Sequence, residues 1–316
     1  MYVTHENHFQ FGWGSSLYNF EDKHGDYWVK FGRAKYIPTS FRDECVRAAR
    51  LIGENAKQPI LVCFSGGIDS EIVVRSFQEA KVPFEVLIMK LKYRNNDHIN
   101  SHDTEYAFNY VNQNSIPYRT ITVDLDDFYR NKLIEEVKKY KAGKYIGILI
   151  HNEMIKQLKG FHCVLGGGDI NLERHRYNGR PNRPGMYLEE EIISIALIES
   201  AHQNKCGISS RFFMHTPELM LSWLLDPDIQ HWIKYEVAFA SKFTNINYFG
   251  IKPFVMFRHW PDMVVRPKFT GLEKIYELHR NGEDPEVAEL IRHAEEIYET
   301  EIIIDYTTLL ENLLPL

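Results

Sequence analysis

Short apolar runs alternate with helix-period segments along residues 59–167, and this alternation sets the predicted fold. Four runs have the composition of strands within a sheet: 59–64 ("PILVCF"), 84–91 ("FEVLIMKL"), 118–125 ("YRTITVDL") and 161–167 ("FHCVLGG"). Helices are predicted between and after the first three runs, over 69–80, 102–114, 126–140 and 147–158. Strands separated by segments of helix length predict an α/β fold with a doubly wound parallel sheet.

The segments on either side of this region have different patterns. Residues 1–40 are rich in aromatics and glycine, which favours short strands and turns, and the spacing of Cys45, Ala49 and Ile52 predicts a helix from Ser40 onward. A polar loop rich in Arg, Pro and Gly is predicted over 172–187 ("LERHRYNGRPNRPGMY"). The chain after it is predicted to be mostly helical, over 188–203, 216–225, 228–241 and 284–300, with an irregular stretch at 257–271.

Three parts are therefore expected. They are an N-terminal extension (1–57), the α/β domain (58–187) and a mostly helical C-terminal lobe (188–316) that packs on it. The chain of 316 residues is long enough for one large domain or two.

Composition narrows the class of protein. Hydrophobic residues make up 44% of the chain and charged residues 25%, which is ordinary for a globular protein. No run approaches the roughly 18 apolar residues of a membrane span, and the first residues lack the order of a secretory signal, so we expect a cytoplasmic protein with no membrane partner. The four cysteines form no C-x-x-C pair, and Cys63 and Cys163 lie in predicted strands, which favours buried free thiols.

Charge bears on the choice of partner. The formal net charge of −6 argues against broad binding to a nucleic-acid backbone. The compact basic run at 138–144 ("KKYKAGK") is explained about as well by a solvated helix end as by a nucleic-acid patch. A small-molecule substrate is therefore the favoured partner, and nucleic acid is less favoured.

The turn after the first predicted strand has the sequence "SGGIDS". Gly66 and Gly67 allow a sharp turn and a close approach of the backbone to a ligand. The helix that follows points the positive end of its dipole at the same place, which favours an anion, and Ser65 and Ser70 add hydroxyl donors. Asp69 would be repelled by a bare phosphate, so its presence predicts a Mg²⁺ ion between its carboxylate and a pyrophosphate group.

These six residues resemble the S-G-G-x-D-S loop of the N-type ATP pyrophosphatases, known as the PP-loop family. That family includes asparagine synthetase, GMP synthetase, NAD synthetase, β-lactam synthetase and several tRNA-modifying enzymes. The resemblance implies an adenine nucleotide alpha hydrolase-like, Rossmann-like domain that binds ATP and Mg²⁺ over residues 58–187. A plain strand-to-helix turn with an Asp cap is the competing interpretation, and the position between a strand and a helix favours the family.

A second glycine-rich cluster, "VLGGGDINLER", occupies residues 164–174. It resembles the downstream motif of the asparagine and β-lactam synthetases, in which an acid follows a glycine-rich turn. The resemblance implies that Gly167 and Gly168 line the nucleotide site and that Asp169 binds the magnesium ion together with Asp69. The synthetases usually continue with an acidic residue where this chain has Ile-Asn, and Gly-Gly-Gly-Asp is also common as a bare turn.

The resemblance gives roles to further residues. The family holds adenine with the backbone at the end of the second strand, which places Met89 near the base. A C-terminal lysine of the family neutralises the departing pyrophosphate, and Lys268 is the candidate here, with Arg266 second; a surface lysine in a loop explains Lys268 equally well. Four arginines after the second cluster can clamp an anion or belong to a solvated lid: Arg174, Arg176, Arg180 and Arg183.

The activity implied by the resemblance is that of an ATP-dependent, AMP-forming ligase. A substrate carboxylate or amide oxygen attacks the α-phosphorus, pyrophosphate leaves, and an amine, ammonia or a similar nucleophile takes the adenylate. The roughly 58 residues before the loop are too few for the glutaminase domain of asparagine synthetase, so we expect free ammonia, an amine substrate or an ammonia-supplying partner. The alternatives are an enzyme that thiolates or amidates a nucleoside or tRNA, and a nucleotide-binding subunit without catalysis.

Overall fold

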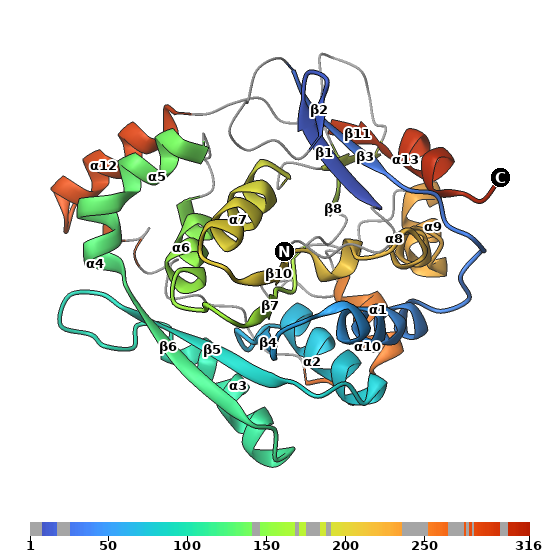
Figure 1. The fold of residues 1–316 in the computed structure, drawn as a ribbon, viewed down its shortest axis with the longest axis horizontal. Coiled ribbons are helices and arrows are strands. Elements are labelled where there is room, and N and C mark those ends of the chain that lie inside the picture. The colour runs from blue at the N-terminus through green and yellow to red at the C-terminus, as the bar shows by residue number, and fades with distance from the viewer. Residues whose placement is uncertain are drawn as a thin grey trace.

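The computed structural model describes most of the chain, and Figure 1 shows its fold. The described residues are 8–17, 26–140, 146–167, 171–174, 184–187, 191–235, 252–264, 275, 278–279, 281–297 and 303–316.

A parallel sheet of five strands lies at the centre of the described part, in the order β10-β7-β4-β5-β6 (Figure 1). Its strands are β4 (Ile60–Cys63), β5 (Glu85–Lys92), β6 (Tyr118–Asp124), β7 (His162–Val164) and β10 (Gly207–Ser209). All four neighbouring pairs run parallel. The predicted α/β fold with a doubly wound parallel sheet is confirmed, and the four predicted strands are β4, β5, β6 and β7.

The order of the strands locates the place where a ligand would bind. The sheet grows from β4 through β5 to β6 on one side, and the chain then returns to add β7 and β10 on the other side. The direction of growth therefore reverses between β4 and β7. In open α/β sheets, ligands bind outside the carboxyl ends of the strands at such a switch point. Both glycine-rich turns of the sequence follow these two strands.

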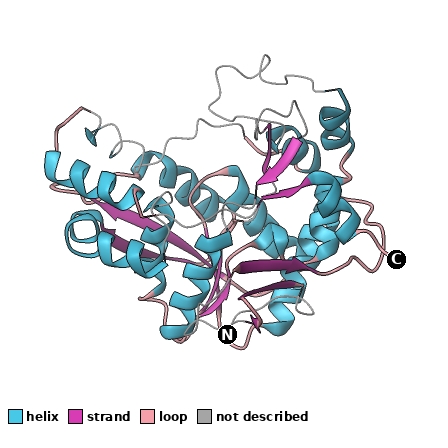
Figure 2. Cartoon of the chain, turned by 90° about the horizontal axis from the view of Figure 1, so that it is seen from above, coloured by secondary structure: helices cyan, strands magenta, loops and turns pink. Residues whose placement is uncertain are grey.

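Helices cover both faces of the sheet (Figure 2). One hydrophobic cluster joins the sheet to α1, α2, α3, α8, α10 and α13, and the other joins it to α5, α6, α7 and α12. The bounds are α1 (Phe41–Asn55), α2 (Ile68–Ala80), α3 (Ser101–Gln113), α5 (Leu133–Tyr140), α6 (Ile146–Ile155), α7 (Glu191–Gln203), α8 (Pro217–Leu224), α9 (Pro227–Tyr235), α10 (Lys252–His259), α12 (Pro285–Glu295) and α13 (Tyr306–Leu313). The helix predicted from Ser40 is confirmed as α1, and the Ser40 side chain accepts a hydrogen bond from the backbone N–H of Asp43.

The helix predicted over 126–140 is interrupted. A short helix α4 (Leu125–Asp127) leads into a π-helical turn (Phe128–Lys132), and α5 follows directly. The wider π turn allows two consecutive aromatic residues, Phe128 and Tyr129, to be buried together with Leu133. Apolar spacing alone cannot reveal such an extra residue in a turn.

Several strands were not predicted. β10 has three residues and is stabilised by pairing with β7, from a distant part of the chain, so its local sequence carries little signal. The polar loop predicted over 172–187 is wrong at both ends, because β8 (Asn171–Arg174) and β9 (Pro184–Tyr187) form an antiparallel pair that β11 (Ile303–Asp305) extends. The stretch predicted as irregular at 257–271 begins inside α10.

The N-terminal segment forms a small sheet of its own, as its composition predicts. Three antiparallel strands, β1 (Phe9–Trp13), β2 (Ser16–Leu17) and β3 (Tyr27–Phe31), pair in the order β2-β1-β3. Phe9 and Phe11 are buried with the second hydrophobic cluster, so this sheet packs on the domain. The division of the chain at residues 57 and 187 stays a prediction.

Candidate functional site

The turn between β4 and α2 is held in place by a close backbone contact at Gly66. Its φ of +91° is a conformation that L-residues with a side chain rarely adopt. A Cβ atom at this position would overlap the backbone carbonyl of Asp103 in the first turn of α3. Glycine is therefore required here both by its conformation and by the approach of α3.

The two serines of the turn face each other. The Oγ atoms of Ser65 and Ser70 lie 3.1 Å apart, and Ser70 Oγ donates to the carbonyl of Gly67 at 2.9 Å. Ser70 is buried, whereas Ser65 is exposed. Ser65 therefore lies at the surface of the turn, and its Oγ also accepts from the N–H of Gly67 at 3.4 Å.

The start of α2 has the features that favour an anion. Its N-cap residue is Gly67, and no side chain caps the helix. The first N–H groups of an α-helix have no partner within the helix, and together with the dipole they attract negative charge. Asp69 lies in this first turn and is half-buried, and Glu71, also in the turn, is paired with Arg75 at 2.8 Å.

The second glycine-rich turn packs directly on the first. A Cβ atom on Gly166 would lie 3.3 Å from Ser70 Cα and 3.4 Å from Ser70 N, a few tenths of an ångström closer than is usual for such a contact. A Cβ atom on Gly167 would lie 3.2 Å from the carbonyl oxygen of Ser210. The two turns that the sequence singled out thus meet at the switch point between β4 and β7.

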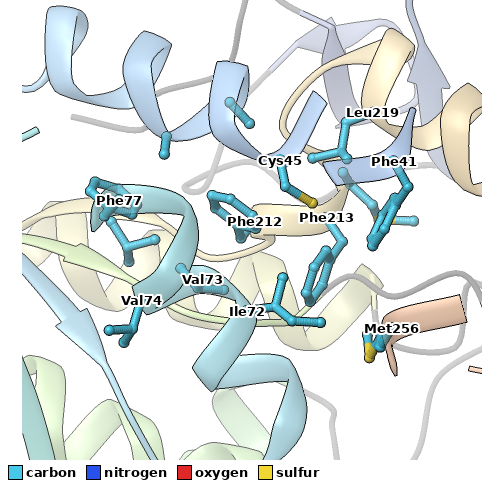
Figure 3. Packing of buried hydrophobic residues seen from close by; sticks show 14 of the residues in the cluster. Phe41, Cys45, Ile72, Val73, Val74, Phe77, Phe212, Phe213, Leu219 and Met256 are labelled. Atoms are coloured by element: carbon cyan, nitrogen blue, oxygen red, sulfur yellow. The ribbon is translucent and has the colours of Figure 1, made fainter. Parts of the chain in front are cut away.

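Hydrophobic packing fixes α2 behind this turn (Figure 3). Ile72, Val73 and Phe77 of α2 are fully buried and belong to one cluster with Phe212 and Phe213. The start of α2 is therefore a rigid part of the domain, which suits it to hold a ligand in one position.

The segment after β10 also contacts these turns, which the sequence did not predict. Arg211 forms a β-bridge with Gly166, and the N–H of Phe212 donates to the carbonyl of Leu165 at 3.2 Å. Ser210 and Arg211 are both buried. The signal that could have revealed them is the polar pair "SR" between a short apolar run and an aromatic pair.

The backbone near Met89 is partly engaged by a side chain. Asn100 donates through Nδ2 to the carbonyl of Met89 at 2.9 Å and accepts from the N–H of Leu91 at 2.9 Å. It thereby covers the edge of β5 beyond the end of β4. The predicted contact of Met89 with adenine stays a prediction.

Several predicted site residues lie outside the described residues: Gly168, Asp169, Arg176, Arg180, Arg183, Arg266 and Lys268. The backbone of Arg174 belongs to β8. The structure thus brings Ser65, Gly66, Gly67, Asp69 and Ser70 together with Gly167, and the roles of all the predicted site residues stay predictions.

Beneath the site, two thiols and one imidazole are buried in the sheet. Cys63 and Cys163 are free cysteines with Sγ atoms 3.4 Å apart, which confirms the prediction of free thiols in strands; Cys163 is fully buried and Cys63 half-buried. Burial lowers the pKa of His162 to about 4, so it is neutral at pH 7 and shares a hydrogen bond of 3.0 Å with Ser209 Oγ. None of these groups lies in the turns themselves.

Within the described ranges, no three His, Cys, Asp or Glu side chains gather as a metal-binding group. Among the described helices, none has both the length and the apolar character that crossing a membrane requires.

Comparison with known proteins gives loose structural matches alone. The sequence matches no family model and no curated protein. An NH3-dependent NAD synthetase from Campylobacter jejuni is 13% identical with a TM-score of 0.29, over 81% of this chain and 92% of that one. An NMN synthetase from Francisella tularensis is 14% identical with a TM-score of 0.30, over 82% and 96%. At these values the likeness carries no argument about this chain.

Proposed function

We propose that this chain is an ATP-dependent ligase of the asparagine synthetase-like type, which forms AMP and pyrophosphate and joins carbon to nitrogen. The observation that carries the proposal is the turn from Ser65 to Ser70. It matches all six positions of the PP-loop, it follows a central strand at the switch point, and it leads into a helix with no side-chain cap.

Mg²⁺ is compatible with the residues present. This ion commonly binds to proteins through one or two carboxylates together with the phosphates of a substrate, and it keeps several waters. The carboxylate of Asp69 in the first turn of α2 can supply one such ligand. The lack of a larger metal-binding group in the described residues agrees with this mode, in which the nucleotide supplies the other ligands.

The protein groups would act by position and charge. The N–H groups at the start of α2 and the Ser65 hydroxyl would bind the β- and γ-phosphates and orient the α-phosphorus toward the substrate oxygen. When bound, Mg²⁺ neutralises charge on the pyrophosphate as it leaves. The substrate would be a small carboxylate or amide, because the net charge of −6 disfavours a polynucleotide.

Pyrophosphate release tests the proposal. The native chain is incubated with Mg-ATP, ammonia and a panel of small carboxylates, and pyrophosphate and AMP are quantified. We expect both products in equal amounts with at least one carboxylate, and a loss of at least a hundredfold in Asp69→Asn.

Asp43→Asn is the matched control, because Asp43 is also an acid in the first turn of a helix but lies in α1. It should retain full turnover. Release of ADP and phosphate, or turnover that survives Asp69→Asn, would contradict the proposal.

A further inference from the structure

The two edges of the five-stranded sheet differ in length and exposure. β10 at one edge has three residues, all of them buried. β6 at the other edge has seven residues and lies on the outside of the sheet (Figure 1), and within the described part of the chain it pairs with β5 alone. Proteins commonly protect an edge with a short strand, a proline or a lysine, because its unpaired backbone groups can pair with another chain. β10 is protected by its length, whereas β6 is long and contains neither proline nor lysine.

The hydrogen bonds to β5 show which backbone groups of β6 point outward. The N–H of Val86 donates to the carbonyl of Pro117 at 2.9 Å, and the two strands continue from there in parallel register. The N–H and C=O groups of one residue point to the same side of a strand, and the side alternates along the chain, so the odd-numbered residues of β6 face β5. Tyr118, Thr120 and Thr122 therefore direct their N–H and C=O groups to the free edge. All three residues are exposed.

The charges on β6 do not oppose the approach of a second copy. Arg119 pairs with Glu85 at 2.6 Å, and Asp124 pairs with Lys92 at 3.0 Å. Both charged residues of the strand thus have an opposite charge beside them. The residues between them are threonine, isoleucine and valine, which are uncharged and favour strands.

The sequence of β6 also complements itself. When two copies pair in antiparallel fashion about a two-fold axis at Ile121, Thr120 of each copy lies opposite Thr122 of the other. These are positions whose N–H and C=O groups point outward, so they can exchange hydrogen bonds, and threonine pairs across strands stabilise a sheet. Ile121 meets its own copy, and in this register no charged residue lies opposite one of like sign. Such a strand suits a second copy of the chain better than an unrelated peptide.

We infer that this chain forms a homodimer in which two β6 strands pair and join the two five-stranded sheets into one. Sedimentation of the full chain tests this inference, and the native protein should have twice the chain mass of 37.2 kDa. Thr120→Pro removes an N–H that points to the free edge and that the pairing with β5 does not use, so it should halve the measured mass without unfolding the chain. Thr120→Ala keeps this N–H and is the matched control, which should remain a dimer.

Two charge variants test the same edge without proline. In Thr120→Glu/Thr122→Glu, like charges lie opposite each other at both threonine pairs, so this chain should be a monomer, as should Thr120→Lys/Thr122→Lys. An equal mixture of the two should form dimers again, because opposite charges then meet. If circular dichroism shows that Thr120→Pro does not fold, the charge variants decide.

A native chain that sediments at 37.2 kDa would overturn the inference, even if an extended peptide were found to bind at this edge. A dimer that persists in the folded proline and charge variants would also overturn it, because the interface would then lie elsewhere.

Discussion

The starts of α2 and α12 show two opposite ways of beginning a helix. α12 begins at Asp284, a buried acid whose side chain accepts from the N–H of Val287 and pairs with Arg94 at 3.0 Å and Arg130 at 2.7 Å. α2 begins at Gly67 with no side-chain cap. The first helix start is capped by a side chain of the protein, and the second has no such cap.

The start of α12 has a structural role. Asp284 ties α12 to the end of β5 and to the π-helical turn, so its role is to hold the C-terminal part against the sheet. Glycine at the start of α2 caps less well than serine by a few tenths of a kcal/mol. α1, α8 and α12 each have a side-chain cap, whereas α2 and α3 have none; α2 differs from α3 in that its N-cap is a glycine in the turn after the central strand β4.

The largest loss of stability and of Mg-ATP binding is expected from Gly66→Ala. The new Cβ would overlap the carbonyl of Asp103 at a φ of +91°, so the turn must move. We expect a loss of about 3 kcal/mol in the free energy of unfolding and no measurable Mg-ATP binding.

Gly160→Ala is its control, because Gly160 has a φ of +83° but nothing within 4 Å of the added atom. It should lower the free energy of unfolding by about 1 kcal/mol and leave the affinity for Mg-ATP unchanged. Equal losses in the two variants, measured by urea unfolding, would show that the contact with α3 is unimportant.

Asp284→Ala should affect stability alone. The change removes a helix cap and the acceptor of two arginines, so we expect the free energy of unfolding to fall by about 2–3 kcal/mol. The Mg-ATP affinity of the folded variant should match that of the native chain in calorimetry. A large loss of Mg-ATP affinity would contradict the assignment of a purely structural role to the start of α12.

Asp284 should also make the free energy of unfolding depend on pH. Burial would raise the pKa of Asp284, but the hydrogen bonds from Arg94 and from the N–H of Val287, with the charge of Arg130, more than offset burial and hold the pKa below its usual value. A lowered folded-state pKa gives stability that is present above the unfolded pKa, about 3.9, and lost as the pH falls through the folded pKa. The stability difference between the native chain and Asp284→Asn should therefore be about 1 kcal/mol at pH 7 and shrink below pH 4. A difference that stays constant down to pH 2.5 in urea unfolding would contradict this assignment.

The smallest change in stability is expected when α2 is given the kind of start that α12 has. Gly67 has a φ of −77°, and its added Cβ would lie 3.5 Å from Ser65 Oγ, so Gly67→Ser fits without strain. We expect a gain of a few tenths of a kcal/mol in thermal unfolding, because serine caps better than glycine. Calorimetry should show Mg-ATP binding weakened several-fold, since the new hydroxyl competes for the same N–H groups. Unchanged affinity would mean that these N–H groups do not bind the nucleotide.

The sequence predicted correctly those strands whose own residues have a strand pattern. The runs that became β4 and β5 are apolar, the run that became β6 alternates polar and apolar residues, and Ser65–Ser70 lies where the motif places it. β10 and the β8–β9 pair escaped prediction because distant strands stabilise them. Arg211 was missed for the same reason, since its place beside Gly166 depends on a strand that the sequence does not reveal.

The most direct test of the site is a crystal structure of the chain with Mg²⁺ and a non-hydrolysable ATP analogue. We expect polyphosphate oxygens about 3 Å from the N–H groups at the start of α2 and from the Ser65 hydroxyl, with the start of α12 unchanged. An analogue bound elsewhere, with the turn from Ser65 to Ser70 filled by protein side chains, would contradict the account.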